Sequence, residues 1–218
     1  MRRTSRLLGV SRRTIAKKLK WLGNLARAAH AEYLKKEEMK TSYVQFDEME
    51  TYEWSKLLPL SIALAVRAKT GDIIGVKMAK MNCHGKTANA SVRRYGRRID
   101  ARLPAAQKVM REIAVVTTPD MTIATDKKAA YRNIIKKELP HATHAIHKSR
   151  KAEALPQAQS KGQPHDPLFA LNHVCAKLRA DLARLHRRTW SASKKANYMQ
   201  DAIDLYVAYH NGHILGEN

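Results

Sequence analysis

The segment LSIALAVRAKTGDIIGVKM, residues 60–78, decides the fold. Its first part, Leu60–Val66, is apolar throughout, which is typical of a strand buried on both faces. Thr70-Gly71-Asp72 indicates a turn, and Ile73–Met78 then predicts an antiparallel return strand. The segment is therefore expected to form a β-hairpin in the interior of a sheet.

Strand and helix patterns alternate on both sides of this hairpin. A short β-rich run, Ser42–Phe46, precedes it and ends at Asp47. Downstream we expect a helix from Pro104 to about Val115, a strand at Met121–Thr125, a helix at Lys127–Leu139, a strand at Thr143–His147, and helices from Asp166 to Leu185 and from Ser193 to His210. This order predicts an α/β fold: an RNase H-like mixed five-stranded sheet, with an antiparallel three-stranded meander, two added parallel strands and flanking helices.

The charge balance points to a polyanionic partner. The 218 residues include 41 Lys and Arg against 19 Asp and Glu, a formal net charge of +22. Such a field favours nucleic acid, although a ribosomal or chromatin-type protein without chemistry would show it too. Cys83 and Cys175 form no C-x-x-C pair, so a zinc ribbon within the chain is excluded and a reduced, cytosolic setting is expected. Because no run of about 18 apolar residues occurs, no membrane association is predicted.

The N-terminal stretch resembles a helix-turn-helix. Residues 1–20 contain eight basic residues and no acid. Thr4–Leu8 indicates a short helix, Gly9 a turn and Ser11 the N-cap of a second helix. That helix would offer Arg12, Arg13, Thr14 and Lys17 to double-stranded DNA. The alternative is a basic amphipathic helix that packs on the protein body. We assign residues 1–40 to the helix-turn-helix and a connector helix, and residues 41–218 to a catalytic domain.

Two aspartates carry the predicted chemistry. Asp47 and Asp126 each follow a short apolar strand, and those strands are expected to be parallel neighbours. Both carboxylates would then emerge at one edge of the sheet, where they can bridge two Mg²⁺ (or Mn²⁺) ions about 3.5–4 Å apart. Mg²⁺ prefers oxygen ligands and keeps several waters. The pair therefore predicts in-line phosphoryl transfer on a phosphodiester; each aspartate taken alone is equally typical of a helix cap or turn.

Several motifs together resemble bacterial insertion-sequence transposases of the DDE class, in particular the insertion-sequence-one family. The quoted residues are Val44–Glu50 with Leu58–Val66, then Ile123–Asp126 with Tyr131, and finally Leu168–His173 with Leu178-Arg179, Arg184-Leu185, Arg187–Trp190 and Ser193-Lys194. The resemblance implies a transposase that cleaves element ends and joins them to target DNA. It also implies at least a homodimer on DNA, because two ends must be brought together.

Two departures from the family pattern affect this reading. The family usually places Glu as the third metal ligand, and the resemblance puts Asn172 there, a neutral amide that coordinates hard cations more weakly. Its alternative is a hydrogen-bonded amide at the helix edge, with Glu153 and Asp166 as the nearest acids. The usual cysteine-rich zinc ribbon before the helix-turn-helix is absent, which leaves an alternative start, a fragment and one product of a split gene as open explanations. The rival functions are an inactive DNA-binding remnant that acts as a repressor, and a nuclease or resolvase of the same fold.

Two further basic surfaces are candidate DNA contacts. The first lies on a predicted basic loop within residues 82–102 and includes Lys86, Arg93, Arg94, Tyr95, Arg97, Arg98 and Arg102. The second includes Arg179, Arg187 and Arg188. Basic side chains can hold phosphates, and the tyrosine can stack on an unpaired base; a solvated charged face is the alternative for each. His144 and His147, on the last predicted strand, are candidates for proton transfer or strand positioning. Trp21, Trp54 and Trp190 are interpreted as packing residues.

Overall fold

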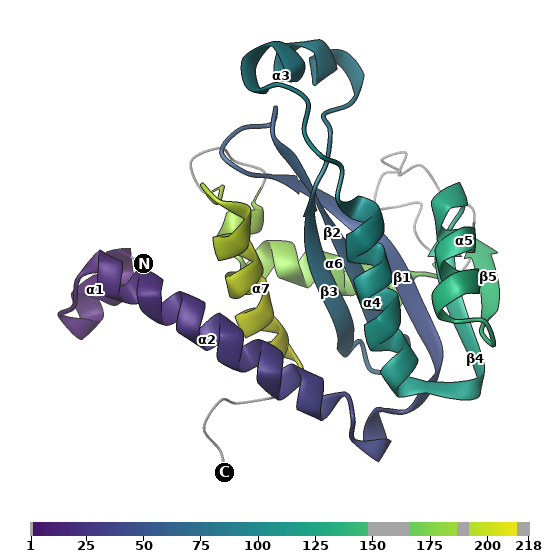
Figure 1. The fold of residues 1–218 in the computed structure, drawn as a ribbon. Coiled ribbons are helices and arrows are strands. Elements are labelled where there is room, and N and C mark those ends of the chain that lie inside the picture. Colours follow the sequence, from purple (N-terminus) through teal and green to yellow (C-terminus); the bar gives the residue numbers. More distant parts are fainter. Residues whose placement is uncertain (1, 148–165, 187–191, 213–218) are drawn as a thin grey trace, which may run out of the picture.

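A central sheet of five strands organises the computed structural model, which describes residues 2–147, 166–186 and 192–212 (Figure 1). Its strand order is β3-β2-β1-β4-β5. The strands are β1 (Thr41–Tyr52), β2 (Pro59–Arg67), β3 (Ile73–Lys80), β4 (Thr117–Asp126) and β5 (Thr143–His147). The first three pair antiparallel, whereas β4 pairs parallel with β1 and β5 parallel with β4. This topology confirms the predicted RNase H-like α/β class.

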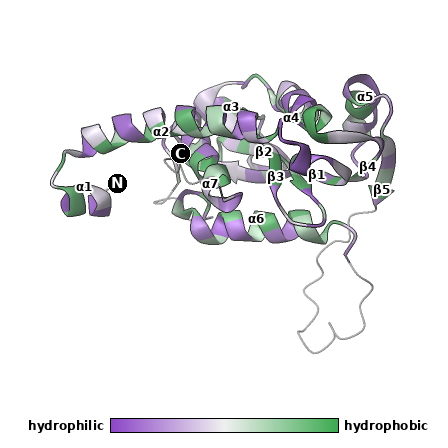
Figure 2. Cartoon of the chain, turned by 90° about the horizontal axis from the view of Figure 1, so that it is seen from below, coloured by the Kyte–Doolittle hydropathy of each residue, from purple (hydrophilic) through white to green (hydrophobic). Residues whose placement is uncertain are grey.

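Helices cover both faces of the sheet. The helices are α1 (Arg2–Leu8), α2 (Arg12–Tyr33), α3 (Ala88–Tyr95), α4 (Arg102–Val116), α5 (Ala129–Glu138), α6 (Phe169–Asp181) and α7 (Ala196–His210), with 3₁₀ turns at Glu37–Met39, Gly85–Thr87 and Ala183–Leu185. Figure 2 shows α4 and α5 on one side of the sheet and α6 on the other. None of the described helices is long and apolar enough to cross a membrane.

The two faces bury separate hydrophobic clusters because β2 is apolar on both sides. Ala63 and Ala65 face a cluster with residues of α4 and α5. Ile62 and Leu64 face a second cluster with residues of α6 and α7. The small alanines leave room for the larger side chains of α4, such as Val109. The continuous apolar run in the sequence thus places β2 in the interior, as predicted.

The strand that carries Asp47 is longer than the sequence predicts. We expected a strand at 42–46 with Asp47 directly after it, but β1 runs from Thr41 to Tyr52 and Asp47 lies within it, opposite Leu64 of β2. The prediction was wrong because residues 47–52 are mostly polar. They remain in the sheet because they pair with β2 as a hairpin that continues beyond the end of β4.

The segment between β3 and α4 also differs from the expectation. We predicted an irregular basic stretch, yet it contains the helix α3, which projects from the body of the molecule at the top of Figure 1. Ser91 is its one buried residue, and Ser91 Oγ donates a hydrogen bond of 2.6 Å to the Leu57 carbonyl. A helix of only eight residues with one buried side chain is too short for the sustained apolar spacing from which helices are predicted.

The N-terminal helices form as the sequence predicts. Gly9 has φ 62°, and Ser11 caps α2 by accepting the Thr14 amide at 3.0 Å. Helix α1 and the first turns of α2 extend away from the sheet (Figure 1). Further along α2, Gly23 contacts α7, where a Cβ would lie 2.9 Å from the Cβ of Asp201. The close approach shows why glycine stands inside this helix.

Candidate functional site

Asp47 and Asp126 lie on neighbouring parallel strands at the centre of the sheet. Phe46 of β1 pairs with Thr125 of β4, so each aspartate is the next residue after a paired position. Alternate residues of a strand face the same side. Gln45 and Ala124, two residues before the aspartates, are themselves paired, so both carboxylates belong to the face of the sheet that Gln45 presents to α6. The strand register therefore puts the two aspartates at neighbouring positions on one face of the sheet.

Gln45 fixes the start of α6 above this face. Its side chain is 5% exposed. Nε2 donates to the Pro167 carbonyl at 2.8 Å, and Oε1 accepts from the Leu171 amide at 2.9 Å. A buried amide that makes both bonds holds the helix rigidly, because a lost partner would leave a polar group unsatisfied. We did not single out Gln45 from the sequence, although a glutamine inside an apolar strand, two residues before Asp47, is a recognisable signal.

The carboxylate of Asp47 is partly buried and only partly compensated. Its Oδ1 accepts the Glu48 amide at 2.7 Å and the Tyr131 hydroxyl at 3.2 Å. The pKa of Asp47 is raised to about 6, chiefly by burial and also by the negative charge of Asp126, while the two hydrogen bonds and Lys128 act in the opposite direction. Because burial and Asp126 destabilise the charged carboxylate, a cation bound beside it would be stabilising.

The nearest lysine does not neutralise the pair. The Lys128 ammonium forms an ion pair with Glu48, whose side chain is 7% exposed, while the Lys128 backbone amide donates to Asp126 Oδ1 at 3.1 Å. In the part of the chain that the structure describes, neither Asp47 nor Asp126 takes part in a salt bridge. Two neighbouring carboxylates without a cationic partner suit a hard divalent cation.

The structure places Asn172 on α6 but gives its side chain another partner. The residue is exposed, and Nδ2 donates to Asp166 Oδ2 at 2.7 Å. One turn further along α6, the pKa of the Cys175 thiol is raised to about 11, chiefly by burial and also by the charge of Asp47. Cys175 therefore lies within electrostatic reach of the site. Asn172 lies three residues before Cys175 and hence on a similar face of the helix. A role for Asn172 as metal ligand stays a prediction.

Within the described part of the chain, no third charged ligand completes the pair. Among residues 2–147, 166–186 and 192–212, no three His, Cys, Asp or Glu side chains are grouped as a metal site. His147 is nevertheless the β5 residue paired with Asp126. Its Nε2 is buried and has no hydrogen-bond partner among those residues. Glu153, considered as a substitute ligand from the sequence, lies outside the described residues.

The predicted DNA contacts fall into two exposed groups and one buried exception. Arg12, Arg13, Thr14 and Lys17 are exposed on α2, and Arg93, Arg94, Tyr95 and Arg97 are exposed on or after α3. Arg98 corrects the prediction: its side chain is 9% exposed, and its guanidinium pairs with Glu53 at 2.5 Å and donates to the Pro59 carbonyl at 2.9 Å. Because these partners occupy the group, Arg98 is a structural residue. Arg179 is half-buried on α6, and Arg187 and Arg188 lie outside the described residues.

Two of the three tryptophans contradict their interpretation as packing residues. Trp21 is 56% exposed and Trp54 is 54% exposed. Trp21 stands on the solvent side of α2, and Trp54 stands on the turn between β1 and β2. Trp190 lies outside the described residues.

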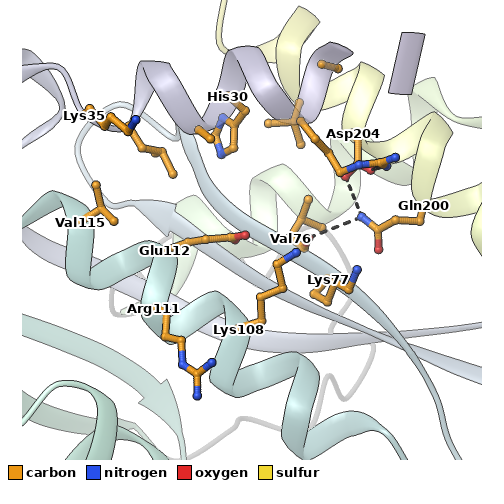
Figure 3. Close-up of a pocket in the computed structure, with 15 residues that line it drawn as sticks. His30, Lys35, Val76, Lys77, Lys108, Arg111, Glu112, Val115, Gln200 and Asp204 are labelled. Atoms are coloured by element: carbon orange, nitrogen blue, oxygen red, sulfur yellow. Dashed lines mark hydrogen bonds and ion pairs between the residues drawn. The ribbon is translucent and has the colours of Figure 1, made fainter. Parts of the chain in front are cut away.

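A cavity of about 570 Å³ lies away from the aspartates, between α2, β3, α4 and α7. Figure 3 shows Glu112, Lys108, Lys77 and His30 around it. Glu112 lies over Gly75 of β3, where a Cβ would come within 2.5 Å of its Oε2. Burial raises the pKa of Glu112 to about 7. None of the predicted catalytic residues lines this cavity.

The strand order and the aspartate pair define an RNase H-like α/β domain with two acidic side chains on its central parallel strands. No family model matches the chain, and no curated protein matches it. A solved structure of the Mos1 strand transfer complex is similar with a TM-score of 0.31 and 9% sequence identity, over 97% of this chain and 73% of that chain. The fold assignment accordingly rests on the order and pairing of the strands.

Proposed function

We propose that this chain is a metal-dependent DNA-processing enzyme of the transposase type, which nicks the ends of an insertion element and joins them to target DNA. The observation that carries the proposal is the placement of Asp47 and Asp126 on one face of adjacent parallel strands, without a cationic partner in the described residues. The net charge of +22 and the motifs that resemble insertion-sequence transposases support DNA as substrate.

The aspartates fit Mg²⁺ or Mn²⁺. They offer hard oxygen ligands, and the pKa of Asp47 is raised by burial and by Asp126, a cost that a bound cation removes. Two such ions, when bound, would activate a water or 3′-hydroxyl and stabilise the leaving oxygen. Asp47 and Asp126 would hold them, and Asn172 on α6 is proposed to supply a third oxygen.

The surrounding residues keep the carboxylates in place. Tyr131 donates to Asp47 Oδ1, and the backbone amides of Glu48 and Lys128 each fix one carboxylate oxygen. Gln45 holds α6 over the same face. Preorganised ligands lower the free-energy cost of binding a cation in the reactive geometry. The exposed basic residues of α2 and α3 are proposed to hold double-stranded DNA, and pairing of two element ends requires at least a dimer.

The test is an assay on labelled duplexes made from the DNA that flanks the gene, with Mg²⁺ or Mn²⁺. We expect nicked and strand-transfer products from the wild type and at least about 10²-fold less from Asp47→Asn or Asp126→Asn. Asp120→Asn is the matched control, because Asp120 is an exposed aspartate on the same strand as Asp126. Cleavage without joining would replace transposition by a nuclease function, and a shifted but uncut duplex would indicate a DNA-binding remnant.

A further inference from the structure

Trp54 has the most unusual backbone among the non-glycine residues that the structure describes. Its φ is 56°, the one positive value outside glycine in those residues. The Ser55 amide donates to the Glu53 carbonyl, so Trp54 occupies the centre of a γ-turn. Such a turn with positive φ is rare and strained, and a bulky residue there is a genuine outlier. Backbone strain of this kind persists where the surrounding structure enforces it, and it clusters at functional sites.

The residue before Trp54 anchors this turn firmly. The side chain of Glu53 is 13% exposed; its Oε1 pairs with Arg98 at 2.5 Å and its Oε2 accepts the Ala196 amide, the first of α7, at 3.0 Å. The amide of Trp54 donates to the Ser193 carbonyl at 2.9 Å. Three elements therefore converge on the turn and hold Trp54 in a conformation that it would not adopt by itself.

The indole is displayed to solvent in spite of these anchors. Trp54 is 54% exposed, and the ammonium of Lys194 lies over its ring at 4.2 Å from the centroid. A lysine over the ring contributes a cation–π contact and places a positive charge beside the aromatic surface. An aromatic face next to a cation is the combination that binds a nucleobase together with its phosphate.

The turn also lies between two basic segments. On one side, Ser91 of α3 is bonded to Leu57 of the same turn, and α3 carries the exposed Arg93 and Arg94. On the other side, Lys194 and Lys195 precede α7 and are exposed. Along β1, the five residue steps from Asp47 to Tyr52 span about 17 Å. That length corresponds to about five base-pair steps of DNA, so one strand can reach from the aspartates to the turn.

We propose that Trp54 is a stacking platform for an unpaired base of the DNA strand that leaves the catalytic face toward α3. The inference rests on the proposed DNA-processing function. It adds that the ligand bound at Trp54 is a nucleobase outside the duplex. The enforced turn would keep the indole ready, so little conformational freedom is lost when the base stacks. Lys194 would contact the neighbouring phosphate.

The test compares a blunt duplex with the same duplex carrying a single-stranded tail. For Trp54→Gly, which removes the indole and suits the positive φ, we expect about tenfold weaker binding of the tailed duplex and nearly unchanged binding of the blunt duplex. Trp54→Phe should keep most of the difference between the two substrates. 2-Aminopurine placed at successive tail positions should be quenched at one position in the wild type and at none in Trp54→Gly.

Trp21→Ala is the matched control, because Trp21 is 56% exposed and has Lys18 over its ring at 5.0 Å, but lies in an ordinary helix. It should leave the ratio of tailed to blunt affinity unchanged. If Trp54→Gly leaves this ratio unchanged, or changes the oligomeric state and not the ratio, the stacking proposal is overturned. The proposal that the protein binds DNA would not be affected. A wild type that binds neither duplex would instead refute the proposed function itself.

Discussion

Asp47 and Asp126 lie side by side on neighbouring parallel strands and face the same layer of the molecule as α6. The burial of Asp47 and the nearby charge of Asp126 both favour the protonated form of the Asp47 carboxyl, whose pKa is about 6. Without a cation, this arrangement costs folding free energy at neutral pH. The pair is therefore expected to influence stability as well as chemistry.

Asp47→Asn should stabilise the metal-free protein at pH 8. Because the folded pKa of Asp47 is raised, its contribution is fully present below about pH 4 and is lost as pH rises through 6. Asparagine does not titrate. The unfolding free energy of the variant minus that of the wild type should therefore be larger at pH 8 than at pH 4, by at most about 3 kcal/mol. Urea unfolding across this pH range, with EDTA present, measures the effect.

Glu112→Gln is the control for this pH dependence. Glu112, in the distant cavity, also has a raised pKa, about 7, and its contribution is lost as pH rises through 7. The unfolding free energy of the wild type should fall as pH rises toward neutral, and each variant should show a smaller fall. Added Mg²⁺ should restore only the part of the fall that is due to Asp47, because the cation would then stabilise the wild type. An equal response of both variants to Mg²⁺ would contradict a metal role for Asp47.

Substitutions at Asn172 test the third ligand. Asn172→Asp should increase cleavage at limiting Mg²⁺ severalfold because a carboxylate binds hard cations more strongly than an amide. Asn172→Ala should reduce it and shift the Mg²⁺ dependence to higher concentration. His173→Ala, the exposed neighbour on α6, serves as control. Cleavage with the same Mg²⁺ dependence in all three variants would restrict Asn172 to its hydrogen bond with Asp166.

Gly23→Ala tests how tightly α2 is docked on α7. In an open helix this change is stabilising by about 1 kcal/mol. Here the new Cβ would meet the Cβ of Asp201 at 2.9 Å and its carbonyl oxygen at 3.1 Å, so we expect a loss of about 1–3 kcal/mol. Ala28→Gly, at an exposed site of α2, measures the propensity effect alone. A Gly23→Ala variant more stable than the wild type would show that α2 and α7 can move apart at little cost in free energy.

The basic face of α2 should dominate the salt dependence of duplex binding. Replacing the exposed Arg12, Arg13 and Lys17 by alanine should lower the slope of log Kd against log salt concentration by about 2–3. The matched control replaces the exposed Arg132, Lys136 and Lys137 of α5. α5 lies at the opposite end of the molecule from α1 (Figure 1). Equal slope changes for both triple variants would indicate diffuse electrostatic attraction and no defined α2 contact.

Periodicity in the sequence predicts the fold well because the decisive strands are apolar. The run Leu60–Val66 can only be an interior strand, and Thr143–His147 has the bounds that we predicted. The same reasoning fails where a strand leaves the core. Residues 47–52 are mostly polar yet stay in β1, because pairing with β2 and the burial of Met49 and Tyr52 hold them in the sheet.

The candidate site is less accessible from sequence, because its details depend on contacts between distant segments. The neighbouring positions of Asp47 and Asp126 follow from strand order, since adjacent parallel strands end at the same edge of the sheet. The bond between Asn172 and Asp166, the ion pair of Arg98 with Glu53 and the exposed indole of Trp54 do not follow from any local pattern. They arise from how loops and helices pack on the sheet.

Binding of Mn²⁺ to the purified protein, followed by the loss of the free-ion signal in electron paramagnetic resonance, tests the two aspartates most directly. The wild type and Asp120→Asn should bind the ion alike, while Asp47→Asn and Asp126→Asn should bind it at least about tenfold more weakly, because each removes one carboxylate ligand. Equal binding by all four proteins, or no binding by the wild type, would contradict a divalent-cation site at Asp47 and Asp126.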